Sequence, residues 1–231
     1  YIDRLKPDIQ QSIEGFLGNK VHDTLEWIYK NPERRTLELD QVIHYYAENW
    51  HKDFNPDIKI VKEDEFDAEH YFNLGIKFLI DYFGKHSPFE DNTIECEKRI
   101  FVNLDSEGKY RLQGYIDRLV HNKENNVFEI HDYKTGSFKN QEDLDKDRQL
   151  ALYSIGVRDM FEEVNDVHLV WHFLDFNKKM VSKRTLDQLE QLKQEIIETI
   201  NKIESATEFP PNQSVLCDWC EFRSYCPLVD N

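Results

Sequence analysis

The spacing of apolar residues changes along this chain, and that change constrains the fold more than any other feature. Up to about residue 85, apolar side chains such as Ile13, Leu17 and Val21 recur every three or four positions, which is typical of amphipathic helices. From about residue 92, runs rich in β-branched and aromatic residues alternate with turn-like segments, which is typical of strands. The sequence therefore predicts a helical first third followed by a sheet.

The expected elements form one mixed α/β (α+β) domain over residues 1–231, in which helices flank a central β-sheet. Helices are predicted near 10–30, 36–53 and 66–85, three successive antiparallel strands near 92–104, 109–120 and 126–134, a helix near 141–161, two strands near 166–175 and 178–184, and a charged helix near 185–205. We divide the domain into a helical region (1–90), a sheet region with its helices (91–205) and a cysteine-bearing tail (206–231), in which Pro210 and Pro211 mark a linker before the cysteines.

The composition restricts the protein classes that fit. Apolar residues make up 39% of the 231 residues, and no apolar run is long enough to span a membrane, so a soluble globular protein is expected. The first residues show no secretory signal, and the four cysteines do not resemble a secreted disulfide framework, which favours a reducing cytoplasm.

The net charge of −16 argues against a globally basic nucleic-acid-coating surface. Local cationic groups do gather around the motifs described below: Lys109, Arg111, Arg118, Lys134, Lys139, Lys146 and Arg148. These groups could line one groove on an otherwise acidic protein.

One face of the third predicted strand ends in charged residues. Successive strand residues point to opposite faces, so Phe128, Ile130, Asp132 and Lys134 share one face. Burying an isolated charge is costly, so a cation, a partner or a substrate is expected to meet these two charges. The alternative is an ordinary Asp132–Lys134 ion pair at the strand end.

The preceding strand supplies a second carboxylate. Asp117 follows Gly114, which permits a close backbone approach, and its strand can pair with the third one. Two converging carboxylates are the oxygen-rich type of site that Mg²⁺ prefers. A cation site formed by Asp117 and Asp132, next to Lys134, is therefore the favoured interpretation.

These residues lie in motifs that resemble a known nuclease family. Gly114 to Leu119 (GYIDRL) and Ile130 to Gly136 (IHDYKTG) are similar to the core motifs of the RecB-like branch of the PD-(D/E)XK nucleases. The same group has a Gln and a Tyr four residues apart on the next helix, matched by Gln149 and Tyr153, and a glycine-led approach to a histidine, matched by Gly18 to His22. Together with the cysteine tail these motifs follow one another in the expected order over residues 18–227.

The resemblance implies a restriction-endonuclease-like core and a phosphodiester-hydrolysing site. It makes His22, Asp117, Asp132 and the Tyr133 carbonyl ligands of one or two Mg²⁺ or Mn²⁺ ions, and it gives Lys134 the role of orienting water or stabilising negative charge. Gln149 and Tyr153 would position the substrate or the lysine. Taken by themselves, His22, Gln149 and Tyr153 could also be ordinary helix-boundary residues, and Glu97 reads as a solvated strand carboxylate beside Lys98 and Arg99.

The tail contains Cys217, Cys220 and Cys226, the last followed by Pro227. Thiolates in such spacing select Zn²⁺ or an iron–sulfur cluster, although three free thiols are the alternative. In the resembling iron–sulfur nucleases the remaining cysteine lies upstream of the first helix, so the resemblance implies a [4Fe-4S] cluster in the intact protein, with its fourth cysteine before Tyr1 and the tail cysteines close to Tyr1 in space. The sequence begins without Met and reads as a fragment, in which the cluster could be absent or incompletely ligated. Cys96 lies in a strand pattern and is expected to be buried instead.

The expected function is therefore a metal-dependent DNA nuclease. The resemblance implies an exonuclease acting on single strands or DNA ends in repair, recombination or CRISPR-type processing, with a helicase or CRISPR-type protein as a possible partner. Two other functions compete with it: a catalytically idle nuclease-fold module that binds DNA or a helicase, and a zinc-stabilised interaction domain. A buried Asp, Asp, Lys set favours the active enzyme, since an idle module has no need of buried acids.

Overall fold

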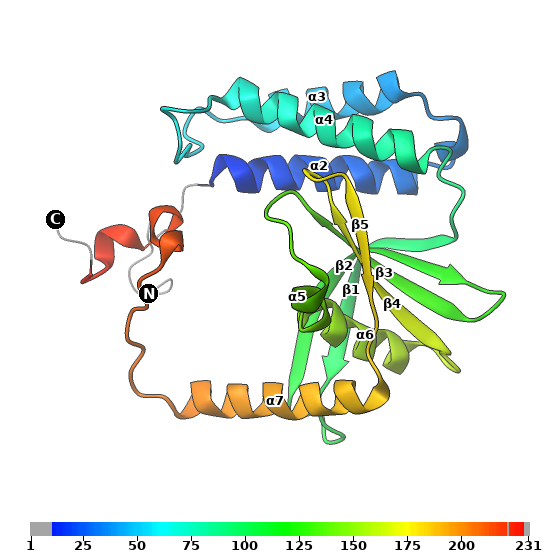
Figure 1. The fold of residues 1–231 in the computed structure, drawn as a ribbon, viewed down its shortest axis with the longest axis vertical. Helices are drawn as coiled ribbons and strands as arrows, with labels where there is room; N and C mark the ends of the chain where they lie inside the picture. The colour runs from blue at the N-terminus through cyan, green and yellow to red at the C-terminus, as the bar shows by residue number, and fades with distance from the viewer. Residues whose placement is uncertain (1–10, 221, 229–231) are drawn as a thin grey trace.

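The structure, a computed structural model, describes residues 11–220 and 222–228 (Figure 1). Its strands are β1 (Thr93–Asn103), β2 (Arg111–Asn122), β3 (Val127–Lys134), β4 (Asp166–Phe173) and β5 (Lys178–Ser182). Its α-helices are α2 (Ile13–Lys30), α3 (Leu39–Asp53), α4 (Ala68–His86), α5 (Gln141–Asp145), α6 (Gln149–Met160) and α7 (Leu186–Ser205). Short 3-10 turns are η1 (Arg34–Thr36), η2 (Val215–Trp219) and η3 (Arg223–Tyr225).

The five strands form one mixed sheet in the order β1-β2-β3-β4-β5. The first three strands pair antiparallel, as the sequence predicts, and β4 and β5 also pair antiparallel. Strand β4 runs parallel to β3 because α5 and α6 cross over between them. This arrangement confirms the expected fold class, a central mixed sheet flanked by helices.

Helices α2, α3 and α4 form a layer at one end of the sheet (Figure 1). Their apolar faces pack together and against the sheet through residues such as Leu25, Tyr46, Phe78 and Tyr133. Helix α2 begins where the Ser12 side chain accepts a hydrogen bond from the amide of Gly15. Helix α2 thus lies between α3 and α4 on one side and the strands that carry the carboxylates on the other.

A second apolar core lies between the sheet and helices α6 and α7. It includes Ile100, Ile130, Leu150 and Trp171, all of them almost fully buried. The apolar strand residues that lead to the charged end of β3 belong to this core. Burial of Phe128 and Ile130 therefore holds in place the strand that ends in Asp132 and Lys134.

The prediction of one continuous helix near residues 141–161 is wrong, because the segment forms two helices, α5 and α6. The Arg184 guanidinium donates hydrogen bonds to the carbonyls of Leu144 and Asp147, at 2.6 and 3.1 Å. The Asp147 side chain then accepts from the amide of Gln149, at 3.0 Å, which starts α6 afresh. A distant arginine thus satisfies carbonyls that would otherwise continue the helix.

The tail leaves the end of α7 and returns toward the start of α2 (Figure 1). Lys59, which pairs with the residues just before α2, donates a hydrogen bond to the carbonyl of Asp218, at 3.1 Å. Within residues 11–220 and 222–228, no helix combines the length and the apolar character needed to cross a membrane.

Candidate functional site

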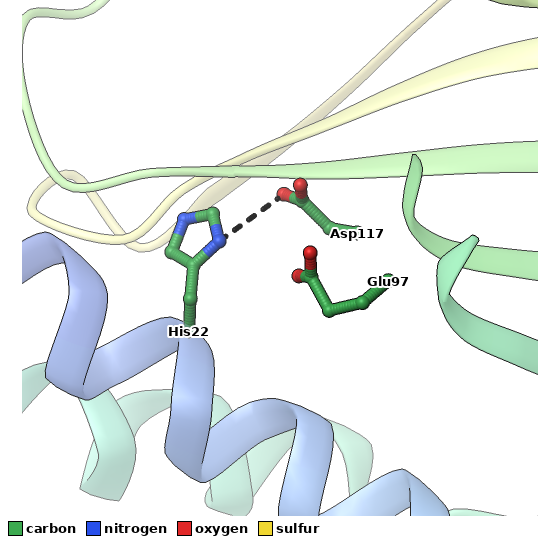
Figure 2. A group of neighbouring side chains, drawn as sticks. All are labelled: His22, Glu97 and Asp117. Atoms are coloured by element: carbon green, nitrogen blue, oxygen red, sulfur yellow. Dashed lines mark ion pairs between the residues drawn. The ribbon is translucent and has the colours of Figure 1, made fainter. Parts of the chain in front are cut away.

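Three side chains from three different elements converge where α2 meets the sheet. They are His22 of α2, Glu97 of β1 and Asp117 of β2, and their potential ligand atoms lie within 4.8 Å of one another. Figure 2 shows the imidazole and both carboxylates pointing toward a common centre. Nitrogen and oxygen donors at this spacing suit a divalent cation. We call these three residues the ligand cluster.

The backbone of Tyr133 orients two members of the ligand cluster. Its amide donates to the Asp117 carboxylate, at 2.8 Å, and its carbonyl oxygen lies 2.9 Å from His22 Nε2. When Nε2 carries the proton and donates to this carbonyl, the Nδ1 lone pair is left facing Asp117, whose Oδ2 is 3.5 Å away. This is the arrangement by which metal-binding histidines are commonly held.

Glu97 lies opposite Asp117 in the β1–β2 pair. The residues on either side of Glu97 pair with those on either side of Asp117, so the two carboxylates face each other across the strands. Like charges in that position destabilise a sheet. Partial desolvation of the carboxylate, followed by the charge of Asp117, raises the pKa of Glu97 above its usual range.

Glu97 is the member of the ligand cluster to which sequence reasoning gave no role. It is exposed, as expected of a strand carboxylate, yet it joins His22 and Asp117. Its backbone φ of 50° is unusual for a non-glycine residue in a strand. Such a conformation has no sequence signature, and only the register of β1 on β2 brings Glu97 to Asp117.

Asp132 and Lys134 form a second group next to the ligand cluster. The Lys134 ammonium donates to Asp132 Oδ1, at 3.0 Å, and to Gln149 Oε1, at 3.2 Å. Asp132 is buried, whereas the Lys134 side chain is 35% exposed. The predicted Asp132, Lys134 and Gln149 therefore lie together at the end of β3.

The Asp132 carboxylate is not fully satisfied by the residues that the structure describes. Its buried Oδ2 lies 2.8 Å from the Lys134 nitrogen, but the angles there are poor and it receives no hydrogen bond. Burial and the neighbouring charge of Asp117 raise the pKa of Asp132. A cation bound beside Asp132 and Asp117 would oppose both effects, so this donor set fits a divalent metal ion.

The ring of Tyr153 packs on Gly114 of β2. A Cβ atom at Gly114 would come within 2.4–2.6 Å of the Tyr153 ring, so only glycine leaves room for this contact. The close approach expected at Gly114 is therefore made by a side chain of α6. In this position Tyr153 holds α6, and with it Gln149, against the sheet.

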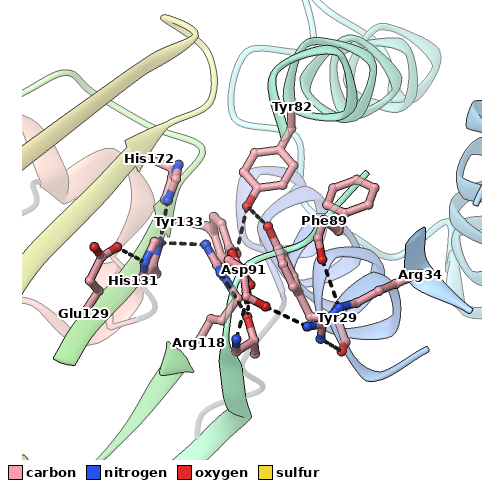
Figure 3. A network of polar contacts seen from close by, with 11 residues as sticks. Tyr29, Arg34, Tyr82, Phe89, Asp91, Arg118, Glu129, His131, Tyr133 and His172 are labelled. Atoms are coloured by element: carbon pink, nitrogen blue, oxygen red, sulfur yellow. Dashed lines mark hydrogen bonds and ion pairs between the residues drawn. The ribbon is translucent and has the colours of Figure 1, made fainter. Parts of the chain in front are cut away.

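A buried polar network contacts the side chain of Tyr133 (Figure 3). Its hydroxyl accepts a hydrogen bond from Arg118 Nε, at 2.8 Å, and lies 3.2 Å from the hydroxyl of Tyr82. Arg118 also lies 2.7 Å from His131 Nδ1 and pairs with the carboxylate of Asp91. The network thus fixes the residue whose backbone orients His22 and Asp117.

The expectation that Arg118 lines a substrate groove is wrong. Only 1% of the residue is exposed, and its guanidinium stacks on the ring of Tyr29, 4.0 Å from the centroid. Ile116 and Leu119 of β2 both belong to the core beneath α6 and α7, so strict alternation is broken between them, and Arg118 reaches Tyr29 and Tyr133 on the side of the helical layer. The guanidinium charge therefore pairs with Asp91 within the protein.

The three tail cysteines line one cavity of about 430 Å³, which also contacts Asp218 and Arg223. Cys96 is buried in the core beneath the helical layer, as expected, and does not line that cavity. All four described cysteines are free. Tyr1, near which the tail was expected to lie, falls outside the described residues.

A comparison with curated proteins found no match. Among solved structures, the crystal structure of SSO0001 is similar to this chain, with 18% sequence identity and a TM-score of 0.39; the match covers 95% of this chain and 98% of that one. The model of the PD-(D/E)XK nuclease superfamily matches residues 1–227. Because that match spans nearly the whole sequence, this chain belongs to the PD-(D/E)XK nuclease superfamily.

Proposed function

We propose that the protein is a divalent-metal-dependent deoxyribonuclease of the RecB-like branch, acting as an exonuclease on single-stranded DNA or DNA ends in repair, recombination or CRISPR-type processing. The observation that carries the proposal is the convergence of His22, Glu97 and Asp117 beside the buried Asp132 and Lys134. The order of motifs from His22 to Cys226 supports the RecB-like assignment.

Different residues would bind the metal ion, orient its ligands and stabilise the charge on the phosphate. His22, Asp117, Asp132 and Glu97 would hold Mg²⁺ or Mn²⁺, which supplies charge neutralisation at the scissile phosphate and acidifies bound water. The Tyr133 backbone orients His22 and Asp117 and can also offer its carbonyl as a ligand. The Lys134 ammonium, held by Asp132 and Gln149, is placed to orient the attacking water or to stabilise negative charge on the phosphate.

Digestion of end-labelled DNA tests this proposal. Purified protein is incubated with single-stranded and double-stranded substrates labelled at either end, with Mg²⁺, Mn²⁺ or EDTA. We expect cleavage that requires the divalent ion and releases short products from an end. Binding without cleavage under every condition would instead identify a catalytically idle module, and endonucleolytic products alone would overturn the exonuclease assignment.

Glu97→Gln should separate metal binding from folding. The substitution removes one like charge opposite Asp117, so the metal-free protein should be at least as stable as the wild type. It also removes an anionic ligand, so Mn²⁺ affinity should fall by about 10-fold or more. Isothermal titration calorimetry and thermal melts in EDTA measure the two effects.

The matched control for that experiment is Glu95→Gln, which removes a β1 carboxylate that pairs with Lys98 outside the ligand cluster. This control should leave Mn²⁺ affinity unchanged. Equal affinity in Glu97→Gln and wild-type protein would exclude Glu97 as a ligand.

We further propose that Cys217, Cys220 and Cys226 ligate a [4Fe-4S] cluster that a fourth ligand completes. Their common cavity and the thiolate preference of iron–sulfur centres support this role. Anaerobically purified protein should contain iron and acid-labile sulfide and absorb in the visible region. Stoichiometric zinc without sulfide, or three thiols that titrate as free, would contradict the cluster.

Serine substitution tests how the cluster contributes to the fold. Because a metal centre contributes folding free energy where its ligands are, Cys220→Ser should loosen the tail first and leave the catalytic sheet intact. Hydrogen exchange should therefore increase in residues 206–227 and not in β2 and β3. Uniformly faster exchange through the sheet would show that the tail is instead needed by the whole fold.

A further inference from the structure

The β1–β2 hairpin carries an exposed row of arginine, aromatic and amide side chains. Within β1 the exposed residues 99, 101 and 103 alternate with less exposed ones, and within β2 residues 111, 113 and 115 do the same. The register places them side by side across the two strands, as the pairs Arg99 with Tyr115, Phe101 with Gln113, and Asn103 with Arg111. We call this row the hairpin face.

Contacts within the hairpin face hold its arginines in place. The guanidinium carbons of Arg111 and Arg99 lie 3.9 and 4.8 Å from the centroid of the Phe101 ring. Arg99 also donates to the side-chain oxygen of Gln113, at 2.6 Å. Neither arginine forms an ion pair with a carboxylate in the part of the chain that the structure describes, so both charges are available to a ligand.

The hairpin face begins beside the ligand cluster. Arg99 and Tyr115 are each two residues from a cluster member, Glu97 and Asp117 respectively, and the next two pairs continue away from it. Residues two apart in a strand are separated by about 7 Å, so the row extends about 20 Å from the cluster. That step is similar to the distance between neighbouring nucleotides of an extended strand.

The charge of the hairpin face differs from that of the whole protein. At a net charge of −16, the protein as a whole repels polyanions, so a phosphate backbone can approach only where cations are concentrated. Arg99 and Arg111, which have no acidic partner among the described residues, provide such a place next to the ligand cluster. Tyr115, 51% exposed, and the supported guanidinium planes provide flat surfaces on which bases can stack.

We infer that the hairpin face binds single-stranded DNA and leads it to the ligand cluster, an inference that rests on the proposed nuclease function. Stacking requires bases that are not already paired and stacked within a duplex, which is why a single strand fits this surface better. The arginines neutralise phosphates while Tyr115 stacks on a base. The face therefore selects unpaired strands without reading their sequence.

Binding measurements on two variants test this inference. Tyr115→Ala should weaken binding of a fluorescent oligodeoxythymidine by about 10-fold, the usual effect of losing one stacking ring. Arg111→Gln should weaken it and lower the slope of log Kd against log salt by about 1, because one phosphate contact is lost. Fluorescence anisotropy in EDTA measures both effects without divalent-dependent cleavage.

Two matched controls remove similar groups elsewhere. Phe176→Ala deletes a ring of comparable exposure in the turn between β4 and β5, and Arg35→Gln deletes an exposed arginine of η1. Both should bind the oligonucleotide as the wild type does. Thermal melts of all four variants confirm that the surface substitutions leave the fold intact.

The readout separates this inference from the proposed function. Wild-type affinity in both Tyr115→Ala and Arg111→Gln, or equal losses in the two controls, would overturn the hairpin face as the binding surface even if the enzyme cleaves DNA. Tighter binding of duplex than of single strands would overturn the choice of ligand. Absence of any cleavage by wild-type protein would contradict the nuclease proposal while leaving the binding result to stand.

Discussion

Replacing Asp132 with asparagine is expected to reduce divalent-dependent DNA cleavage by on the order of 10³-fold or more, since removal of a single preorganised charge from an active site already has effects of that size. The substitution keeps an oxygen for Lys134 and removes the buried charge that faces Asp117. Lys134→Ala should cause a similar loss, because no other ammonium donates to Asp132 among the described residues. Single-turnover cleavage of labelled DNA with Mg²⁺ measures both.

The same variants should leave the fold intact. Burial and the charge of Asp117 already oppose ionisation of Asp132, so Asp132→Asn should not lower the free energy of unfolding in EDTA. A matched control is Asp145→Asn, at an exposed carboxylate outside the site, which should cleave at the wild-type rate. Wild-type cleavage by Asp132→Asn, or loss of activity that only follows loss of folding, would contradict the assigned role.

The second large effect, a loss of folding stability, is expected when Arg118 is replaced. Replacing this buried guanidinium with methionine removes one hydrogen-bond or ion-pair partner from each of the Tyr133 hydroxyl, His131 Nδ1 and the Asp91 carboxylate. Removing one partner of a fully buried charge pair costs about 3–5 kcal/mol of unfolding free energy. Because the Asp91 side chain is 35% exposed, the loss should lie toward the lower end of that range. Urea denaturation measures the change.

The control for Arg118 is an arginine in an exposed ion pair. Arg148 pairs with Glu195, and both side chains are well exposed, so Arg148→Met should cost no more than about 1 kcal/mol. If Arg118→Met were as mild as Arg148→Met, the network could not be what fixes Tyr133. Tighter binding of Mn²⁺ by Arg118→Met would also contradict that role, because Tyr133 orients two proposed ligands.

Local patterns in the sequence were sufficient to predict most elements. Helix α7 begins at a Thr185 capping box, and β3 alternates until its apolar residues give way to Asp132 and Lys134. Both features depend on neighbours within a few positions. The same alternation predicted that Asp132 and Lys134 would lie on one side of β3, and the structure joins them by a hydrogen bond.

Features that depend on residues far apart in the sequence could not be predicted from local patterns. The break between α5 and α6 needs Arg184, and the inclusion of Glu97 needs the β1–β2 register. The role of Arg118 likewise depends on residues far away in the sequence. Its sequence context suggested a substrate contact, and only the packing of α2 and α4 against the sheet shows that its partners are tyrosines and Asp91.

The location of a bound Mn²⁺ ion tests the central claim most directly. Anomalous diffraction from crystals soaked in Mn²⁺ should show an ion within about 2.0–2.4 Å of His22 Nδ1 and of carboxylate oxygens from Asp117 and Glu97, with Asp132 next to it. Occupancy should fall in Glu97→Gln crystals. An ion bound only elsewhere, with these three side chains unliganded at saturating Mn²⁺, would contradict the ligand cluster and the catalytic site built on it.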